Sequence, residues 1–191
     1  MNAILKVIQL YKNNNDLIKK AKKQNREAQR MLYEQYAPKM LSVCRYYIKD
    51  LQHAEDVMLN GFFKAFTNIN QFQDKGSFEG WLRKIMVRES ISFLRQKKGF
   101  EFSIEETNFV VEYQNDIYDK MNVAEIQELI DSLPEGYKVV FIMYAIEGYK
   151  HHEIAKHLDI SEGTSKSQLS KARKLLQKKI KELNSKSYGT N

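Results

Sequence analysis

Residues 151–176 are HHEIAKHLDISEGTSKSQLSKARKLL, and this stretch decides the fold of the C-terminal part of the chain. Ile154 and Leu158 recur at helical spacing and predict a short helix. A turn follows at Asp159, and Ser161 is a good N-cap for a longer, basic helix. This order predicts a helix-turn-helix, whose second helix fits the major groove of DNA. An ordinary helical hairpin with a solvated basic face is the alternative on this pattern alone.

The rest of the chain extends this helical pattern. The 191 residues include only 8 Gly and 2 Pro, which argues against an all-β fold rich in tight turns. Apolar residues recur every three or four positions, and the segments that follow this rule are 17–51, 54–69, 81–94, 126–133 and 135–147. Between two of them, NQFQDKGSFEG at residues 70–80 is predicted to be a polar loop. We therefore predict an all-α protein.

Charge divides the chain into parts. Residues 83–98 carry six basic residues and one acid, a net charge of +5. Residues 100–122 carry six acids and one base, a net charge of −5, and residues 161–185 return to +5. The pattern indicates two small basic helical domains joined by an acidic linker, with the helix-turn-helix in the second domain.

The predicted boundaries follow from these charges and from the helical spacing. They are a first domain at 1–99, a linker at 100–122, a second domain at 123–185 and a tail at 186–191.

Several classes of site are excluded by residue type. The single cysteine, Cys44, can form neither an internal disulfide nor a zinc site that needs several thiolates. His152 and Glu153 begin a sequence like the zinc-protease motif, but Lys156 stands where the second histidine belongs. We predict no catalytic residue, metal or cofactor. No stretch is long and apolar enough for a membrane span or a signal peptide, so we expect a cytoplasmic protein without membrane insertion.

A family resemblance spans nearly the whole chain. The segments LYEQYAPKML, HAEDVMLNGFFKAF and GSFEGWLRKIM, followed by FLRQKK, resemble region two of a bacterial RNA polymerase sigma factor over residues 16–98. Residues 129–176 resemble its region four. The order and spacing are similar to the two-domain extracytoplasmic-function group. The resemblance implies a transcription initiation factor that binds core RNA polymerase and recognises the minus-ten and minus-thirty-five promoter elements.

The resemblance also implies a polymerase-binding helix. Glu55 and Asp56 would pair with basic residues on the clamp helices of the largest polymerase subunit. The same helix would contribute Val57, Phe62 and Lys64. An acid pair near a helix N-terminus is also favoured by the helix dipole, whatever its partner. The family's usual Gln-Glu pair is replaced by Leu59–Asn60.

The resemblance also implies which residues bind the minus-ten element. The family's base-capturing loop matches residues 70–80, where Phe72 and Phe78 would stack on an unpaired base. An alternative is that Phe78 and the nearby Trp81 belong to the core. The residues that would meet DNA beside the loop are Arg83, Lys84 and Arg88.

For the minus-thirty-five element, the resemblance selects the second helix of the helix-turn-helix. The residues that would face the groove are Lys166, Ser167, Ser170 and Lys171, and those placed for phosphates are Thr164, Gln168, Arg173 and Lys174. Gln168 replaces a common arginine, and Ser165 replaces a buried valine or isoleucine.

The implied partners are core RNA polymerase, promoter DNA and an anti-sigma factor. The second candidate function is a stand-alone helix-turn-helix regulator that binds duplex operators without polymerase. The first domain separates the two, because a simple repressor has no need of the HAEDVM helix or the aromatic loop. An enzyme is the third class, and it lacks a convergent acid–base or metal set.

Overall fold

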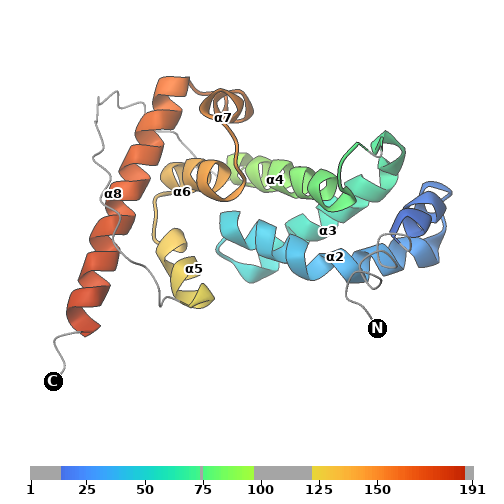
Figure 1. Cartoon of the computed structure of the whole chain (residues 1–191), viewed down its shortest axis with the longest axis horizontal. Helices are drawn as coiled ribbons and strands as arrows, with labels where there is room; N and C mark the ends of the chain where they lie inside the picture. The colour runs from blue at the N-terminus through green and yellow to red at the C-terminus, as the bar shows by residue number, and fades with distance from the viewer. Residues whose placement is uncertain (1–13, 74, 97–121, 188–191) are drawn as a thin grey trace, which may run out of the picture. The chain divides into compact units, whose positions relative to one another are not determined.

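The computed structural model describes residues 14–73, 75–96 and 122–187 (Figure 1). The chain divides into two compact units, Met1–Phe93 and Leu94–Asn191, and each is described here by itself. Over the described ranges every regular element is a helix, so the prediction of an all-α fold is confirmed. The predicted linker at 100–122 lies outside the described residues except for Asn122, and its boundaries stay predictions.

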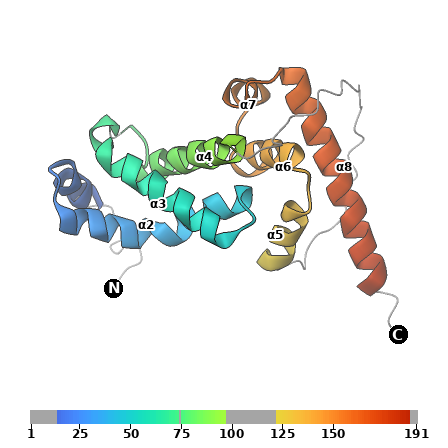
Figure 2. The same ribbon diagram turned by 180° about the vertical axis from the view of Figure 1, so that it is seen from behind.

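The first unit is a small helical bundle. Residues 14–22 are helical, and α2 (Arg26–Tyr47), α3 (Leu51–Thr67), the 3₁₀ turn η1 (Ile69–Gln71) and α4 (Phe78–Gln96) follow. Capping is local: the Asn25 and Asp50 side chains accept hydrogen bonds from backbone N–H groups at the starts of α2 and α3. Helices α2 and α3 lie side by side, as Figures 1 and 2 both show. The predicted loop is shorter than expected, because α4 already begins at Phe78.

Apolar side chains of α2 and α4 pack in the core of the first unit. Leu32, Met40, Leu82 and Met86 are fully buried. On α3, Gly61 has no side chain, and a Cβ atom at this position would collide with the sulfur of Met86. Glycine at this point therefore lets α3 approach α4 closely.

Cys44 is part of the same core. Burial raises the pKa of its thiol to about 12, so the thiol stays protonated and chemically inert. Cys44 thus packs as a small hydrophobic residue.

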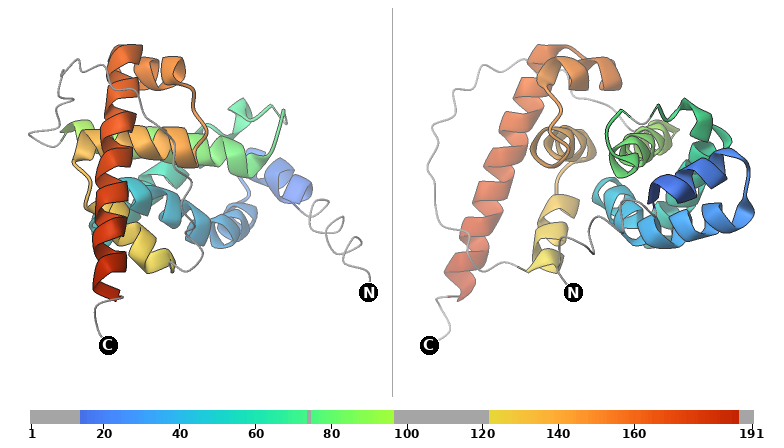
Figure 3. Two further views of the ribbon diagram at one scale, coloured as in Figure 1. Left: turned by 60° about the vertical axis from the view of Figure 1, so that its left-hand side comes forward. Right: turned by 45° about the vertical axis from the view of Figure 1, so that its right-hand side comes forward.

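The second unit contains the helix-turn-helix. It is built from α5 (Val123–Asp131), α6 (Glu135–Phe141), the π turn η2 (Ile142–Ile146), α7 (His151–Leu158) and α8 (Glu162–Ser187). The long helix α8 packs against α6 and α7 (Figure 3). Asn122 and Glu125 form a reciprocal capping box at the start of α5.

One helix of this unit differs from its prediction. Helical spacing predicts one helix over 135–147, but the last turn widens, and the Glu147 N–H donates to the Ile142 carbonyl at 3.0 Å. The chain then leaves through Gly148, whose φ of 74° is left-handed. The side-chain pattern that predicts a helix does not distinguish a four-residue from a five-residue hydrogen bond.

Candidate nucleic-acid interface and docking face

The turn between α7 and α8 has the geometry of a tight helix-turn-helix. Asp159 adopts φ 57° and ψ 49°, a left-handed conformation that Asp accommodates better than most residues. The Ile160 N–H donates to the Ala155 carbonyl at 3.1 Å, which closes the end of α7. Asp159 thus fills the position at which this kind of turn usually has glycine.

Ser161 caps the start of α8. Its hydroxyl accepts a hydrogen bond from the Thr164 N–H at 2.9 Å and lies 2.9 Å from the Thr164 hydroxyl. Thr164 is only 9% exposed. This corrects the prediction of an exposed phosphate ligand, because the Thr164 hydroxyl belongs to the cap.

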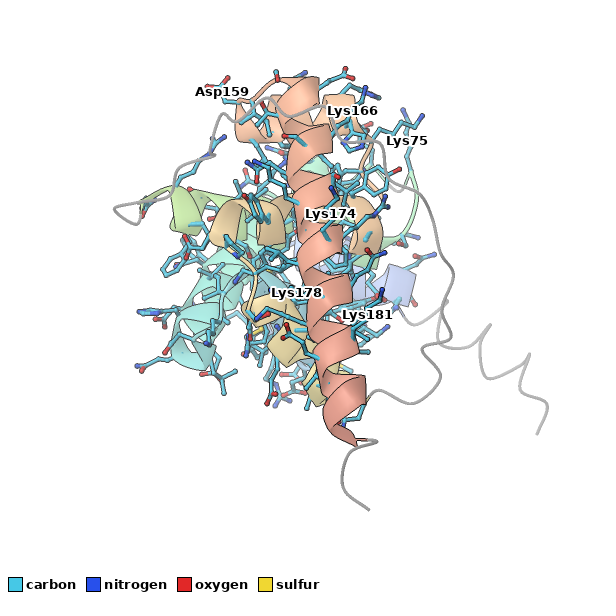
Figure 4. All side chains as sticks on the ribbon, turned by 90° about the vertical axis from the view of Figure 1, so that its left-hand side faces the viewer. Lys75, Asp159, Lys166, Lys174, Lys178 and Lys181 are labelled. Carbon is cyan, nitrogen blue, oxygen red and sulfur yellow. The ribbon has the colours of Figure 1, made fainter. Side chains whose placement is uncertain are left out.

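The outward face of α8 is basic, and we define it by Lys166, Ser167 and Lys174. The two lysines are exposed, and Figure 4 shows them along α8 together with Lys178 and Lys181. The Lys166 ammonium lies 3.9 Å from Glu162, an exposed pair that contributes little to stability. Ser167 is half-buried. Ser170 is only 8% exposed and its hydroxyl oxygen is buried, which corrects the prediction that this side chain faces the groove. Positive charge is therefore presented along one side of this helix.

Gln168 faces the opposite direction. It is 1% exposed and lies one helical turn from Ser165 and Ala172, which are both fully buried. The prediction that its side chain is placed for a phosphate is therefore wrong for this structure. The Gln168 side chain is buried inside the unit instead of projecting into solvent.

Lys171 and Arg173 lie at the edges of the basic face. Both are half-buried. The Lys171 ammonium is 6.0 Å from the centroid of the Tyr137 ring, and the Arg173 guanidinium carbon is 5.5 Å from that of Tyr144. These cation–π contacts hold both side chains against neighbouring aromatic rings.

A polar contact joins the two helices of the motif. His151 Nδ1 lies 2.9 Å from the Ser165 hydroxyl, and the His151 ring stacks on Tyr144 with centroids 4.7 Å apart. Ser165 is fully buried at the position where the family resemblance leads one to expect valine or isoleucine. The histidine therefore supplies the partner that a buried hydroxyl requires.

The surroundings of His151 disfavour its charged form. Burial is the largest cause that lowers the pKa of this imidazole, and the positive charges of Lys166 and Arg173 act in the same direction. Glu162 opposes them. Neutral imidazole is thus favoured beside a basic surface.

The predicted base-stacking rings lie inside the first unit. Phe72 and Phe78 are each 5% exposed, with ring centroids 5.4 Å apart. Trp81 packs 5.7 Å from Phe72 and 5.5 Å from Phe78, and it is half-buried. This corrects the prediction that Phe72 and Phe78 offer open stacking faces, because the three rings cover one another. The alternative that Phe78 belongs to the core is confirmed.

Helix α4 presents basic side chains next to this cluster. Lys84 and Arg88 are exposed and one turn apart, so they share a face of the helix, whereas Arg83 is half-buried. On the turn before α4, the amide side chains of Asn70 and Gln71 are exposed. Cations and amides are therefore available where the resemblance implies the minus-ten element.

The predicted polymerase-binding residues divide between the surface and the core. Glu55 and Asp56 are exposed on α3. Val57 is 4% exposed and Phe62 is 3% exposed, with the Phe62 ring packed 4.8 Å from that of Tyr33. The expectation of direct contact by Val57 and Phe62 is therefore corrected, since both support the helix from within.

Lys64 also has a partner within the unit. Its ammonium donates to Glu89 of α4 at 2.7 Å. The Glu89 side chain is 17% exposed, so the pair is partly shielded from water. Lys64 thus links α3 to α4.

Two apolar residues of α3 are missed by the sequence prediction of this site. Leu59 is 50% exposed and Phe63 is 72% exposed. Their four-residue separation places them on one face of the helix with Glu55 and Asp56. The sequence pattern that could have identified Leu59 and Phe63 is that both positions lie outside the buried apolar stripe of this helix, which is formed by Ala54, Val57, Met58 and Phe62.

Comparisons with known proteins match both units to parts of one family. Residues 32–100 match the family model for Sigma-70 region 2, and residues 124–176 match the model for Sigma-70, region 4. RNA polymerase sigma factor SigV of Bacillus subtilis is 30% identical over 131 residues, which cover 68% of this chain and 77% of SigV. The chain belongs to the extracytoplasmic-function (ECF) sigma factors.

Further relatives of this sigma factor match along most of their length. ECF RNA polymerase sigma factor SigW of Bacillus subtilis is 26% identical over 179 residues, 87% of this chain and 96% of SigW. Among solved structures, the sigma factor RpoE of Bartonella quintana, in complex with the anti-sigma factor NepR, has a TM-score of 0.53 at 21% identity. The match covers 80% of this sigma factor and 96% of the solved RpoE chain. The structure of CnrH in complex with the cytosolic domain of CnrY has a TM-score of 0.51 at 18% identity. This match covers 88% of the sigma factor described here and 97% of the solved chain.

Family membership decides the general activity. The sigma factor is a transcription initiation factor that directs RNA polymerase to promoters, and it is not an enzyme. Among the described residues, no group of three His, Cys, Asp or Glu side chains could hold a metal ion. Within the same ranges, no helix is long and apolar enough to cross a membrane.

Proposed function

We propose that this sigma factor docks on core RNA polymerase through the acidic–apolar face of α3, defined by Glu55, Asp56, Leu59 and Phe63. The observation that carries this proposal is an exposed apolar pair beside two exposed carboxylates. Exposed apolar side chains within a charged rim are typical of interaction surfaces. The carboxylates would pair with basic clamp helices, and the apolar pair would supply contact area.

Val57, Phe62 and Lys64 would then act indirectly. The first two pack beneath the docking face, and Lys64 holds α3 to α4 through Glu89. Substituting them would disturb the shape of the face without removing a direct contact.

For the minus-ten element, we propose that α4 and the preceding turn hold the melted strand. Lys84 and Arg88 would neutralise phosphates, assisted by Arg83. The exposed amides of Asn70 and Gln71 would hydrogen-bond to an unpaired base, since single-stranded bases offer their pairing edges. Phe72 and Phe78 would form the packed floor beneath them, with Trp81 at its partly open edge.

For the minus-thirty-five element, we propose that the outward face of α8 enters the major groove. Lys166 and Ser167 would lie toward base edges, and Lys174 would contact a phosphate. Lys171 and Arg173 would contact DNA from the edges of this face, where aromatic rings hold them. Lys and Ser recognise bases less rigidly than Arg or Asn, so modest isolated affinity is expected.

We also propose a cytoplasmic location and an anti-sigma partner. A promoter-directing factor acts where the polymerase and the chromosome are. The similar RpoE and CnrH structures each contain a second protein, NepR and CnrY respectively, and the first of these is described as an anti-sigma factor.

A DNA titration with and without core polymerase tests the proposed function. The probe is a pool of duplex fragments from the chain's native genome, and specific binding is followed by gel shift. We expect weak binding by the chain alone, since two domains on a tether grip DNA together only when their spacing matches the promoter. Core polymerase should convert this to tight, sequence-specific binding.

The same titration separates the two candidate functions. Nanomolar sequence-specific binding by the chain alone, with no co-elution with core polymerase at low salt, would favour the stand-alone regulator. A variant with the acids of residues 100–122 neutralised serves as a control, because the net charge of −5 on this segment can compete with DNA phosphates for the basic helices.

A further inference from the structure

We propose that the helix over residues 14–22 positions the turn at residues 69–73, here named the minus-ten turn, and that Lys22 is its positioning residue. The inference rests on the proposed role of this turn in capturing an unpaired base. The helix precedes both regions matched by the family models, which begin at residues 32 and 124. It therefore lies outside the residues that those models match.

Two contacts join Lys22 to one residue of the minus-ten turn. The Lys22 ammonium donates a hydrogen bond to the Phe72 carbonyl oxygen at 2.8 Å. The same ammonium lies 5.4 Å from the centroid of the Phe72 ring. One cation thus holds both the backbone and the side chain of a residue fifty positions away in sequence.

Phe72 is the point at which the turn is attached to α4. Its N–H donates to the Ile69 carbonyl at 3.1 Å and closes η1. Its ring packs against Phe78 and Trp81, both on α4. Restraining Phe72 therefore restrains the direction in which the neighbouring amides of the turn point.

The helix that carries Lys22 is itself firmly held. Leu17, Ile18 and Ala21 are at most 7% exposed, so one face of the helix is buried. At its other end the Asn14 amide donates to the Tyr36 hydroxyl at 2.9 Å, and the Tyr36 ring lies 5.6 Å from Phe78. Both ends of the helix thus reach the same aromatic cluster, and Figures 1 and 2 show the helix beside α2.

A lysine suits this position because hydrogen bonds from charged donors are stronger than neutral ones, and the site is partly shielded. Without the ammonium, the Phe72 carbonyl loses its donor and the turn becomes less rigid. Binding of a single strand then has to order the turn as well. We expect a loss of about threefold to tenfold in affinity for the unpaired strand, which is the range that follows from one lost hydrogen bond.

The test uses holoenzyme assembled from the full chain and core polymerase. The probe is a fluorescent oligonucleotide with the single-stranded minus-ten sequence that wild-type holoenzyme selects from a randomised pool. The variants are Lys22→Met, which keeps most of the side-chain stem, and Lys22→Arg, which keeps a cationic donor. The matched control is Lys19→Ala, an exposed lysine of the same helix.

Lys22→Met should weaken strand capture about threefold to tenfold, with core co-elution unchanged and the thermal midpoint lowered by only a few degrees. Lys22→Arg should retain at least half of the wild-type affinity, and Lys19→Ala should behave as wild type. Wild-type capture by Lys22→Met would overturn the inference, as would a parallel loss of core binding, which would indicate a general structural role. Failure of wild-type holoenzyme to select any sequence would instead refute the proposed function of the turn.

Discussion

Replacing Phe63 with alanine should weaken binding to core polymerase while leaving the fold intact. Fully burying a phenylalanine contributes roughly 1.5–3 kcal/mol. Because 72% of Phe63 is exposed in the free chain, most of this contribution is still available on docking. We expect a loss of about 1–2 kcal/mol, which corresponds to a roughly 5-fold to 30-fold rise in Kd.

The assay is a fluorescence anisotropy titration of labelled chain with core polymerase, alongside a thermal melt of the free chain. Stability should change by no more than about 0.5 kcal/mol, since an exposed ring makes few contacts within the fold. Met31→Ala is the matched control, because Met31 is 41% exposed on α2 and lies outside the docking face. A Kd for Phe63→Ala within twofold of wild type, or a loss matched by Met31→Ala, would refute the reasoning.

The remaining predictions concern the other faces of the chain and its core. Asp56→Arg should abolish co-elution with core polymerase at an unchanged melting temperature, because it inverts one charge of the docking face; retained co-elution would contradict this. Lys166→Ala should cost roughly 1–3 kcal/mol in promoter binding that depends on sequence, and an equal loss on all sequences would assign the lysine to a phosphate. The fold holds the pKa of His151 below its ordinary value of 6.5. The neutral imidazole therefore contributes fully to stability above pH 6.5, and this contribution is lost as the pH falls through the lower pKa of the folded state. A series of thermal melts at different pH values should show this decline in stability, and His151→Gln should remove the decline. Gly61→Ala should change the free energy of unfolding by no more than about 1 kcal/mol, because the helix propensity that alanine gains offsets the shift that its methyl group forces on the flexible end of the Met86 side chain; a melt lowered by more than this would show that Met86 cannot move aside.

Agreement between sequence and structure is best where the determinants are local. Ser161 can be identified as a cap because its hydroxyl accepts a hydrogen bond from the Thr164 N–H, only three residues ahead. The left-handed turn at Asp159 follows from the same short-range logic. Interactions within one turn of helix need no knowledge of the rest of the chain.

Agreement is poorer for residues near the edge of an apolar stripe. Gln168 differs by only two positions from exposed Lys166, yet it points into the unit. A step of two residues is about 200° around a helix, so a motif match that treats neighbouring positions alike cannot separate the two faces. The direction depends on where α6 and α7 lie against α8.

The aromatic residues illustrate the same limit in the first unit. A phenylalanine in a polar segment such as QFQDKGSF suits both a stacking face and a core anchor. The Phe72 and Phe78 rings are enclosed because Trp81 and Tyr36, from two helices, pack against them. That enclosure is a property of the assembled bundle.

The sequence by itself determined the helical class, the helix-turn-helix and the residue types available for DNA and polymerase, because spacing, capping and charge are local. Only the tertiary structure decided which of those residues reach the surface, because exposure depends on helices that are distant in sequence. It placed Val57 and Phe62 inside and left Leu59 and Phe63 outside. It also joined Lys22 to Phe72, a contact for which no sequence pattern exists, since its two partners meet only when the bundle forms.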